Sequence, residues 1–242
     1  MPTLRLALLA PAILCAAAAA QHRQPATLRP DSARWTLTLP ADWEFAPDDV
    51  VQQLNAETQA KGIAITYIAG IRITDTSGPY ALVQGVGPLP PGLTADQIRN
   101  LVGTGLAAGF DQAKEKLADS LSNVAAQSTS LDVQRAQLRA RGTITNADGS
   151  KLELMSVAHF GTLQSVFIHC YAPPELFEQS LPRFEELNAG LAFDPGFQLI
   201  IAQTPQPTNS GLPVALVAGV AAAVTTGILV FIRQRKRAAP HA

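Results

Sequence analysis

The 242 residues include 18 basic and 19 acidic side chains, and 47% of the chain is hydrophobic. All 19 acidic side chains lie in residues 21–211 together with 13 of the basic ones, so this part has a net charge of −6. Such a surface repels phosphate backbones and disfavours nucleic acid as a partner. It also contains a single cysteine, Cys170, which excludes an internal disulfide there.

Residues 1–20 have the layout of a secretory signal peptide. Arg5 supplies the positive charge, an apolar run follows, and Ala18 and Ala20 form an A-x-A cleavage site. The alternative is a lipoprotein signal in which Cys15 is acylated, but Leu14 occupies a position where such signals have a small residue. We expect cleavage after Ala20, followed by a polar leader over residues 21–33.

The next segments predict a strand, a helix and a hairpin. Residues 34–39 alternate apolar and polar side chains, which is typical of a strand. Residues 47–62 have a helical apolar stripe and end at a glycine. The β-branched segment 63–74 and the segment 79–86 are expected to pair as a hairpin.

A long helix is expected to begin at the capping box of Thr94 and Gln97. Apolar residues recur after it at intervals of three or four as far as Val124. Gly103 lies in this pattern and lowers helix stability by about 1 kcal/mol relative to alanine.

Residues 131–171 predict three successive strands with Ile144 opposite Leu152. In this register both faces of the sheet carry apolar side chains, so both need cover. We expect the long helix and a final helix, capped by Ser180 with Pro182 in its first turn, to supply that cover. One face collects Leu138, Ala140, Ile144, Leu152, Leu154, Leu163, Phe167 and Tyr171, and the other collects Met155, Val157, Val166, Ile168 and Cys170.

The fold class expected from these elements is α+β. An antiparallel sheet of five or six strands would be flanked by helices in an α/β/α sandwich formed by residues 34–198.

Three segments carry a resemblance to a known group of domains. They are WTLTLPADWEF at 35–45, the strands at 131–171, and PPELFEQSLPRFEELNAGLAF at 173–193. This order resembles the Mog1/PsbP-like α/β/α sandwich and would cover most of residues 34–195. The group includes photosystem II accessory proteins, a Ran-binding protein and exported bacterial domains. The resemblance implies binding of other proteins or assistance to assemblies, without shared catalytic residues.

The C-terminal part predicts a membrane anchor. A linker at 199–211 leads to residues 212–232, which carry no charge and are long enough to cross a bilayer as a helix. The tail at 233–242 begins with four positive charges in five residues. The positive-inside rule then places the tail in the cytoplasm and the domain outside the bacterial cytoplasmic membrane.

Small residues recur every fourth position in this span. Ala215, Gly219, Ala223 and Gly227 form a small-xxx-small ridge of the kind that lets two transmembrane helices approach closely. The ridge predicts a homodimer through the transmembrane helix. The alternative is that alanine and glycine are simply frequent in the span.

No recognisable catalytic, cofactor or metal motif occurs in the sequence. His169 and Cys170 are neighbours on a strand, so their side chains point to opposite faces and cannot form a nucleophile–base pair. No spacing of cysteine or histidine typical of a zinc site occurs, and no phosphate-binding loop or nucleophile elbow is found. We therefore expect no catalytic residue, cofactor or metal, and we expect Cys170 to be a small buried side chain. Trp35, Trp43, Tyr67 and Tyr80 are interpreted as core residues rather than as the lining of a ligand groove.

These observations favour a membrane-anchored, exported binding or scaffolding domain without catalytic activity and with protein partners outside the membrane. The alternatives are an extracytoplasmic hydrolase whose site has no sequence motif, and a C-terminal tail that serves as a processing signal.

Overall fold

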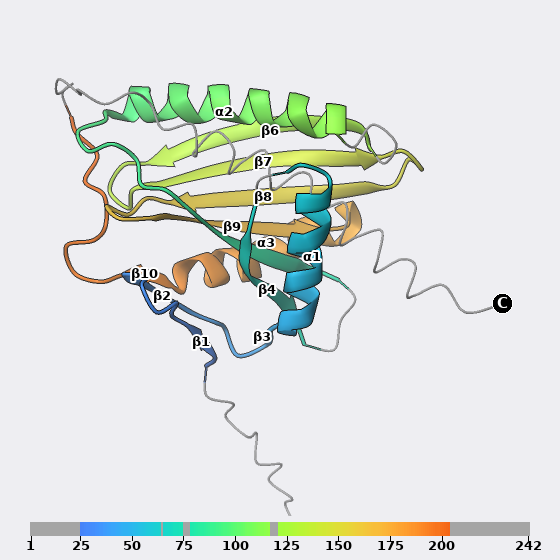
Figure 1. The fold of residues 1–242 in the computed structure, drawn as a ribbon, viewed down its shortest axis with the longest axis horizontal. Helices are drawn as coiled ribbons and strands as arrows, with labels where there is room; N and C mark the ends of the chain where they lie inside the picture. Colours follow the sequence, from blue (N-terminus) through green and yellow to red (C-terminus); the bar gives the residue numbers. More distant parts are fainter. Residues whose placement is uncertain (1–24, 64, 75–77, 117–120, 204–242) are drawn as a thin grey trace, which may run out of the picture.

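The computed structural model describes residues 25–63, 65–74, 78–116 and 121–203, which form two antiparallel sheets and three helices (Figure 1). The larger sheet has seven strands in the order β3-β4-β5-β9-β8-β7-β6, and the smaller sheet has the order β1-β2-β10. The α+β class and the flanking helices are confirmed, whereas the prediction of one sheet with five or six strands is wrong. The strands are β1 (Thr27–Leu28), β2 (Trp35–Thr38), β3 (Trp43–Phe45), β4 (Tyr67–Ile73), β5 (Tyr80–Val86), β6 (Leu121–Asp132), β7 (Gln137–Asn146), β8 (Lys151–His159), β9 (Ser165–Ala172) and β10 (Leu191–Phe193).

Strand β2, which was expected in the large sheet, belongs to the small sheet instead. Strand β2 buries alternate side chains, Trp35 and Leu37, as its sequence pattern predicts. It pairs with β10, placing Leu37 opposite Leu191, and with β1 on its other side. Strand β1 lies inside the predicted leader 21–33, so the folded part begins earlier than expected.

Helix α1 (Asp48–Ala60) and the hairpin that follows it agree with the sequence pattern. Val51 and Leu54 face inward, and Gly62 adopts a left-handed conformation just after the helix. Strands β4 and β5 pair antiparallel, and residues 75–77 of the loop between them lie outside the described residues. Helix α1 packs against β4 on one face of the large sheet (Figure 1).

Helix α2 (Ala95–Lys116) begins as expected but ends earlier. Gln97 N donates to Thr94 Oγ1 at 3.3 Å, and Thr94 N donates to Gln97 Oε1 at 2.8 Å, which completes the capping box. The helical prediction for Leu121 and Val124 is wrong, because both belong to β6. This strand lies at the edge of the large sheet, and only Leu121 and Val124 of its residues are buried, so it lacks the alternation that identifies a half-buried strand.

The predicted register of the following strands is confirmed. Ile144 lies opposite Leu152, and the two apolar faces separate as expected. One face packs against α1 and α2, and the other packs against α3 (Pro174–Ala189) and the small sheet. Leu163 is the exception, because it lies in the turn between β8 and β9 and is 59% exposed.

Helix α3 begins seven residues before the expected start. Pro173 precedes its first turn, and Pro182 lies inside the helix rather than at its beginning. Ser180 does not cap the helix; its hydroxyl donates to the carbonyl of Leu176 at 2.6 Å. Pro182 has no backbone N–H to donate within the helix. The hydrogen bond of the Ser180 hydroxyl lies in the turn just before this proline.

Residues 197–202, which we call the strap, extend the fold into the predicted linker 199–211. Leu199 and Ile201 are buried against the α2 side of the sheet. The predicted signal peptide, the span at 212–232 with its ridge residues, and the tail at 233–242 lie outside the described residues. Of the helices in the described part, none combines the length and the apolar character that crossing a bilayer requires.

Two glycines are expected to respond oppositely to alanine. A Cβ at Gly190 would lie 2.1 Å from the backbone oxygen of Thr38, whereas a Cβ at Gly103 would meet nothing within 4 Å. Gly190→Ala should therefore lower the free energy of unfolding by about 1–3 kcal/mol. Gly103→Ala should raise it by about 1 kcal/mol. Urea unfolding of the two variants measures both changes, and equal effects would contradict the packing of α3 against β2.

Candidate functional site

A pocket of about 320 Å³ lies where the small sheet meets the end of the large sheet. The loop before β2, the end of β5, the turn between β8 and β9, strand β10 and the strap all contribute to it. Its size is at the lower end of the range for small-ligand sites. We call it the junction pocket. Its lining residues are Ser32, Ala33, Arg34, Trp35, Gly85, Val86, Gly87, Leu163, Gln164, Phe193 and Phe197.

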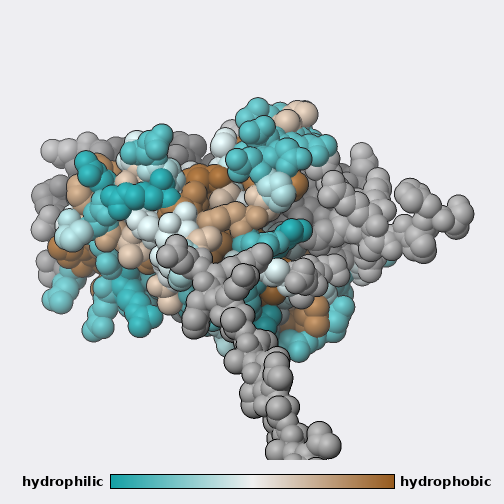
Figure 2. Space-filling model, turned by 90° about the horizontal axis from the view of Figure 1, so that it is seen from below, coloured by the Kyte–Doolittle hydropathy of each residue, from teal (hydrophilic) through white to brown (hydrophobic). Residues whose placement is uncertain are grey.

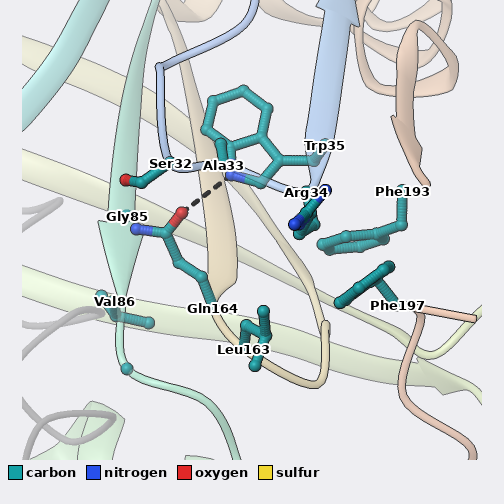
Figure 3. Close-up of a pocket in the computed structure, with 11 residues that line it drawn as sticks. Ser32, Ala33, Arg34, Trp35, Gly85, Val86, Leu163, Gln164, Phe193 and Phe197 are labelled. Atoms are coloured by element: carbon teal, nitrogen blue, oxygen red, sulfur yellow. Dashed lines mark hydrogen bonds between the residues drawn. The ribbon is translucent and has the colours of Figure 1, made fainter.

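One hydrogen bond at the junction pocket joins the small sheet to the turn between β8 and β9. The indole Nε1 of Trp35 donates to Oε1 of Gln164 at 2.8 Å (Figure 3). The amide of Gln164 lies against Gly85, where a Cβ would come within 2.4 Å of its Nε2. A side chain larger than glycine at position 85 would therefore displace the amide that holds Trp35.

The pocket combines aromatic walls with a cation. The guanidinium of Arg34 lies 5.2 Å from the ring centroid of Phe197, within the range of a cation–π contact. Figure 3 shows Phe193 and Phe197 on one side, Gly85 and Val86 on the other, and Leu163 and Gln164 between them. The ring of Phe193 packs closely against the turn between β8 and β9. A Cβ added at Gly161 in this turn would lie 2.4 Å from the ring.

This lining suits a group with an apolar body and a negative or hydrogen-bonding end. The rings and Leu163 provide apolar contact, while Arg34, the Gln164 amide and the Ser32 hydroxyl provide polar contact. Arg34, Gln164 and Phe197 are not predicted from the sequence. They come from three separate segments, and no sequence spacing links them.

The four aromatic residues singled out from the sequence belong to the core, as expected. Trp35, Trp43, Tyr67 and Tyr80 are all buried. Trp35 additionally forms the inner boundary of the junction pocket through its indole edge. The interpretation as core residues is therefore confirmed, and one of the four also contributes to the pocket.

Cys170 is buried on the face covered by α3, as predicted. Asn188 of α3 lies between two of the sheet's polar side chains: its Nδ2 is 3.7 Å from Cys170 Sγ, and its Oδ1 is 3.2 Å from His159 Nε2. Burial raises the pKa of the Cys170 thiol far above its usual range. The thiol therefore stays protonated, and this geometry is that of a structural tie between α3 and the sheet.

His169 belongs to a second buried network, on the opposite face of the sheet. Its Nδ1 lies 2.8 Å from Ser156 Oγ, and its Nε2 lies 3.2 Å from Gln84 Oε1. A serine–histidine pair at this distance resembles a nucleophile and its base. All three side chains are buried, and none of them lines the junction pocket. The network links β8, β9 and β5 inside the core.

Other candidate groups are not brought together in the described part of the chain. His22 and His241 lie outside it. Within it, no cluster of three histidine, cysteine, aspartate or glutamate side chains is arranged to hold a metal ion. The predicted interface residues Ala215, Gly219, Ala223 and Gly227 lie outside the described residues, so the homodimer stays a prediction.

Comparison with known proteins finds similarity at the level of structure only. No protein-family model and no curated protein matches the sequence. The solution structure of cyanobacterial PsbP (CyanoP) from Synechocystis sp. PCC 6803 matches with a TM-score of 0.45 and 10% identity, covering 70% of this chain and 92% of that one.

Two further solved structures show similarity of the same kind. The Ran-binding protein Mog1p of Saccharomyces cerevisiae has a TM-score of 0.38 and 8% identity, covering 70% of this chain and 95% of that one. LpqN, involved in cell envelope biogenesis of Mycobacterium tuberculosis, has a TM-score of 0.34 and 11% identity, covering 72% and 88% respectively. Two of these structures, PsbP and Mog1p, bear the names of the group that the sequence resembles.

The two buried histidines predict a loss of stability in mild acid. Burial lowers the pKa of His169 from 6.5 to about 3 and that of His159 from 6.5 to about 4. Below pH 6.5 the unfolded chain binds protons that the folded chain does not, so the free energy of unfolding falls as pH falls. The loss is about 2 kcal/mol per histidine at pH 5.

Urea unfolding between pH 7.5 and 5 measures this loss. His159→Gln serves as the matched variant, because an amide can replace the ring in its hydrogen bonds without taking up a proton. It should show about half of the wild-type pH dependence. A stability that stays level from pH 7.5 to 5 in the wild type would contradict the burial of neutral imidazoles.

Proposed function

We propose that the chain is an exported binding or scaffolding domain, held at the bacterial cytoplasmic membrane by the predicted span at 212–232. The junction pocket is its binding site, and its role is recognition rather than catalysis. The observation that carries the proposal is the combination of the exposed Arg34 guanidinium, the Gln164 amide and aromatic walls around about 320 Å³ of space.

The pocket favours a partner that offers an apolar group next to a negative charge. Arg34 is exposed and carries a guanidinium that can bind a carboxylate or phosphate through two parallel hydrogen bonds. A protein partner can present such a group as an apolar side chain beside a carboxylate. The predicted pairing of spans through Ala215, Gly219, Ala223 and Gly227 would place two pockets near each other, which suits a scaffold.

The competing hydrolase hypothesis would use the pair of Ser156 and His169. A hydrolase requires substrate to reach the serine oxygen, and both side chains are enclosed in the core between β8 and β9. The junction pocket, by contrast, is open and contains no serine–histidine pair. These placements favour binding over hydrolysis.

Protease protection tests the proposed topology. We expect protease added to spheroplasts to degrade residues 25–203 and to spare an epitope placed after residue 242. The reason is that the positively charged tail is expected to remain on the cytoplasmic side. Permeabilised cells, in which both parts are accessible, provide the control. A domain that stays intact in spheroplasts but is degraded after permeabilisation would refute the export proposal.

A fluorescent anion tests the pocket. Anilinonaphthalene sulfonate combines an aromatic body with a negative group, so we expect it to bind the junction pocket of the folded chain. Arg34→Ala should weaken binding about tenfold, because a charge-assisted hydrogen bond contributes on the order of 1.5 kcal/mol. Arg29→Ala is the matched control, since Arg29 pairs with Asp194 and does not line the pocket. Equal weakening in both variants, or none in either, would contradict the proposed site.

A further inference from the structure

Three large apolar side chains are exposed at one end of the domain. They are Val133 at 40% exposure, Leu163 at 59% and Ile200 at 86%. Val133 lies in the turn between β6 and β7, Leu163 in the turn between β8 and β9, and Ile200 in the strap. Single exposed apolar residues are normal on a protein surface, but these share one end of the fold.

The strap ties these three places together. Thr162 N donates to Phe197 O at 2.8 Å, and Gln198 Nε2 approaches Gln134 O at 3.5 Å. Leu199 N donates to Phe160 O at 2.9 Å, which holds the strap against the same turn. We call this surface, made of residues 133–136, 160–164 and 197–202, the strap end. It lies at the left of Figure 1, and Figure 2 shows brown apolar surface among hydrophilic residues at that side.

The chain also leaves the domain at the strap end. Ala202 N donates to Leu93 O at 3.0 Å, one residue before Gln203, the last residue that the structure describes. Eight residues, 204–211, separate Gln203 from the predicted span. Even fully extended they reach roughly 30 Å, so the strap end cannot move far from the bilayer in an anchored chain.

We propose that the strap end rests on the lipid bilayer, with Ile200, Leu163 and Val133 inserted into its outer surface. This inference rests on the proposed membrane anchoring and specifies how the domain is oriented there. The short linker keeps the local concentration of the domain at the bilayer high, so shallow insertion of three side chains is sufficient to hold the orientation.

Neighbouring residues are compatible with contact to a lipid surface. Arg135, in the turn between β6 and β7, is largely exposed, and its Nε lies 3.8 Å from Asp132 Oδ2. Arg34 lies at the edge of the junction pocket. Both are available to anionic head groups. Leu163 lines the junction pocket as well, so the pocket opens next to the bilayer and its ligand is met at the membrane surface.

Site-specific fluorescence in vesicles tests the orientation. The full chain, with Cys15→Ser to leave only the buried Cys170, would be reconstituted into phosphatidylcholine–phosphatidylglycerol vesicles. An environment-sensitive dye would be attached at Ile200→Cys or Leu163→Cys. The control is Ala147→Cys, an exposed position in the turn between β7 and β8 at the opposite end of the sheet. Lipids carrying a spin-label quencher should remove most of the emission at 200 and 163 and little at 147.

A second variant separates insertion from simple proximity. Ile200→Asp changes a side chain that is 86% exposed, so the fold should be retained. It should reduce quenching at position 163 severalfold, because a buried carboxylate opposes insertion. Equal quenching at 147 and 200 overturns the proposal, as does unchanged quenching at 163 in the Ile200→Asp variant.

The remaining outcomes distinguish this inference from the proposed anchoring. If the chain is stripped from vesicles by alkaline carbonate, anchoring fails and the orientation fails with it. If the chain is retained but position 200 is not quenched, anchoring stands and the orientation alone is wrong. A blue-shifted emission at 200 without quenching by lipid shows that protein covers the strap end, which also overturns the proposal.

Discussion

Strand β9 is buried on both faces along all eight of its residues, and the arrangement of the other elements follows from that constraint. A strand of this kind needs a neighbour on each edge and a packed layer on each face. Strands β5 and β8 supply the neighbours. Helices α1 and α2 cover one face, and α3 with the small sheet covers the other.

The same constraint explains the histidine and cysteine in this strand. Most buried polar side chains in proteins have a hydrogen-bond partner inside the protein, and two of those in β9 follow this rule. His169 finds Ser156 and Gln84, while Cys170, on the other face, lies against Asn188 of α3. The two side chains thus stabilise different layers of the fold. Residue types associated with catalysis here connect elements of the core.

The junction pocket lies where the small sheet meets the end of β5 and the turn between β8 and β9. The small sheet packs on the face shared with α3, and the Trp35–Gln164 hydrogen bond joins it to that turn. Beyond that bond lie a cation, an amide and two aromatic rings around open space. The pocket and the strap end are adjacent, since Leu163 and Phe197 belong to both. Recognition and membrane contact are therefore proposed for one end of the domain.

The sequence by itself determined the local elements and the register of the central strands. Apolar alternation in β2, the capping box of α2 and the pairing of Ile144 with Leu152 depend on neighbours close in the chain, and all three are confirmed. It did not reveal β6 or the start of α3. The edge strand lacks alternation, and Pro182, which is typical of a first turn, lies inside the helix.

Only the tertiary structure decided that β2 leaves the large sheet to pair with β10, and that Arg34, Gln164 and Phe197 surround one pocket. These residues are up to 163 positions apart in the chain. Their meeting depends on how two sheets pack together, which no spacing of residue types in the sequence encodes.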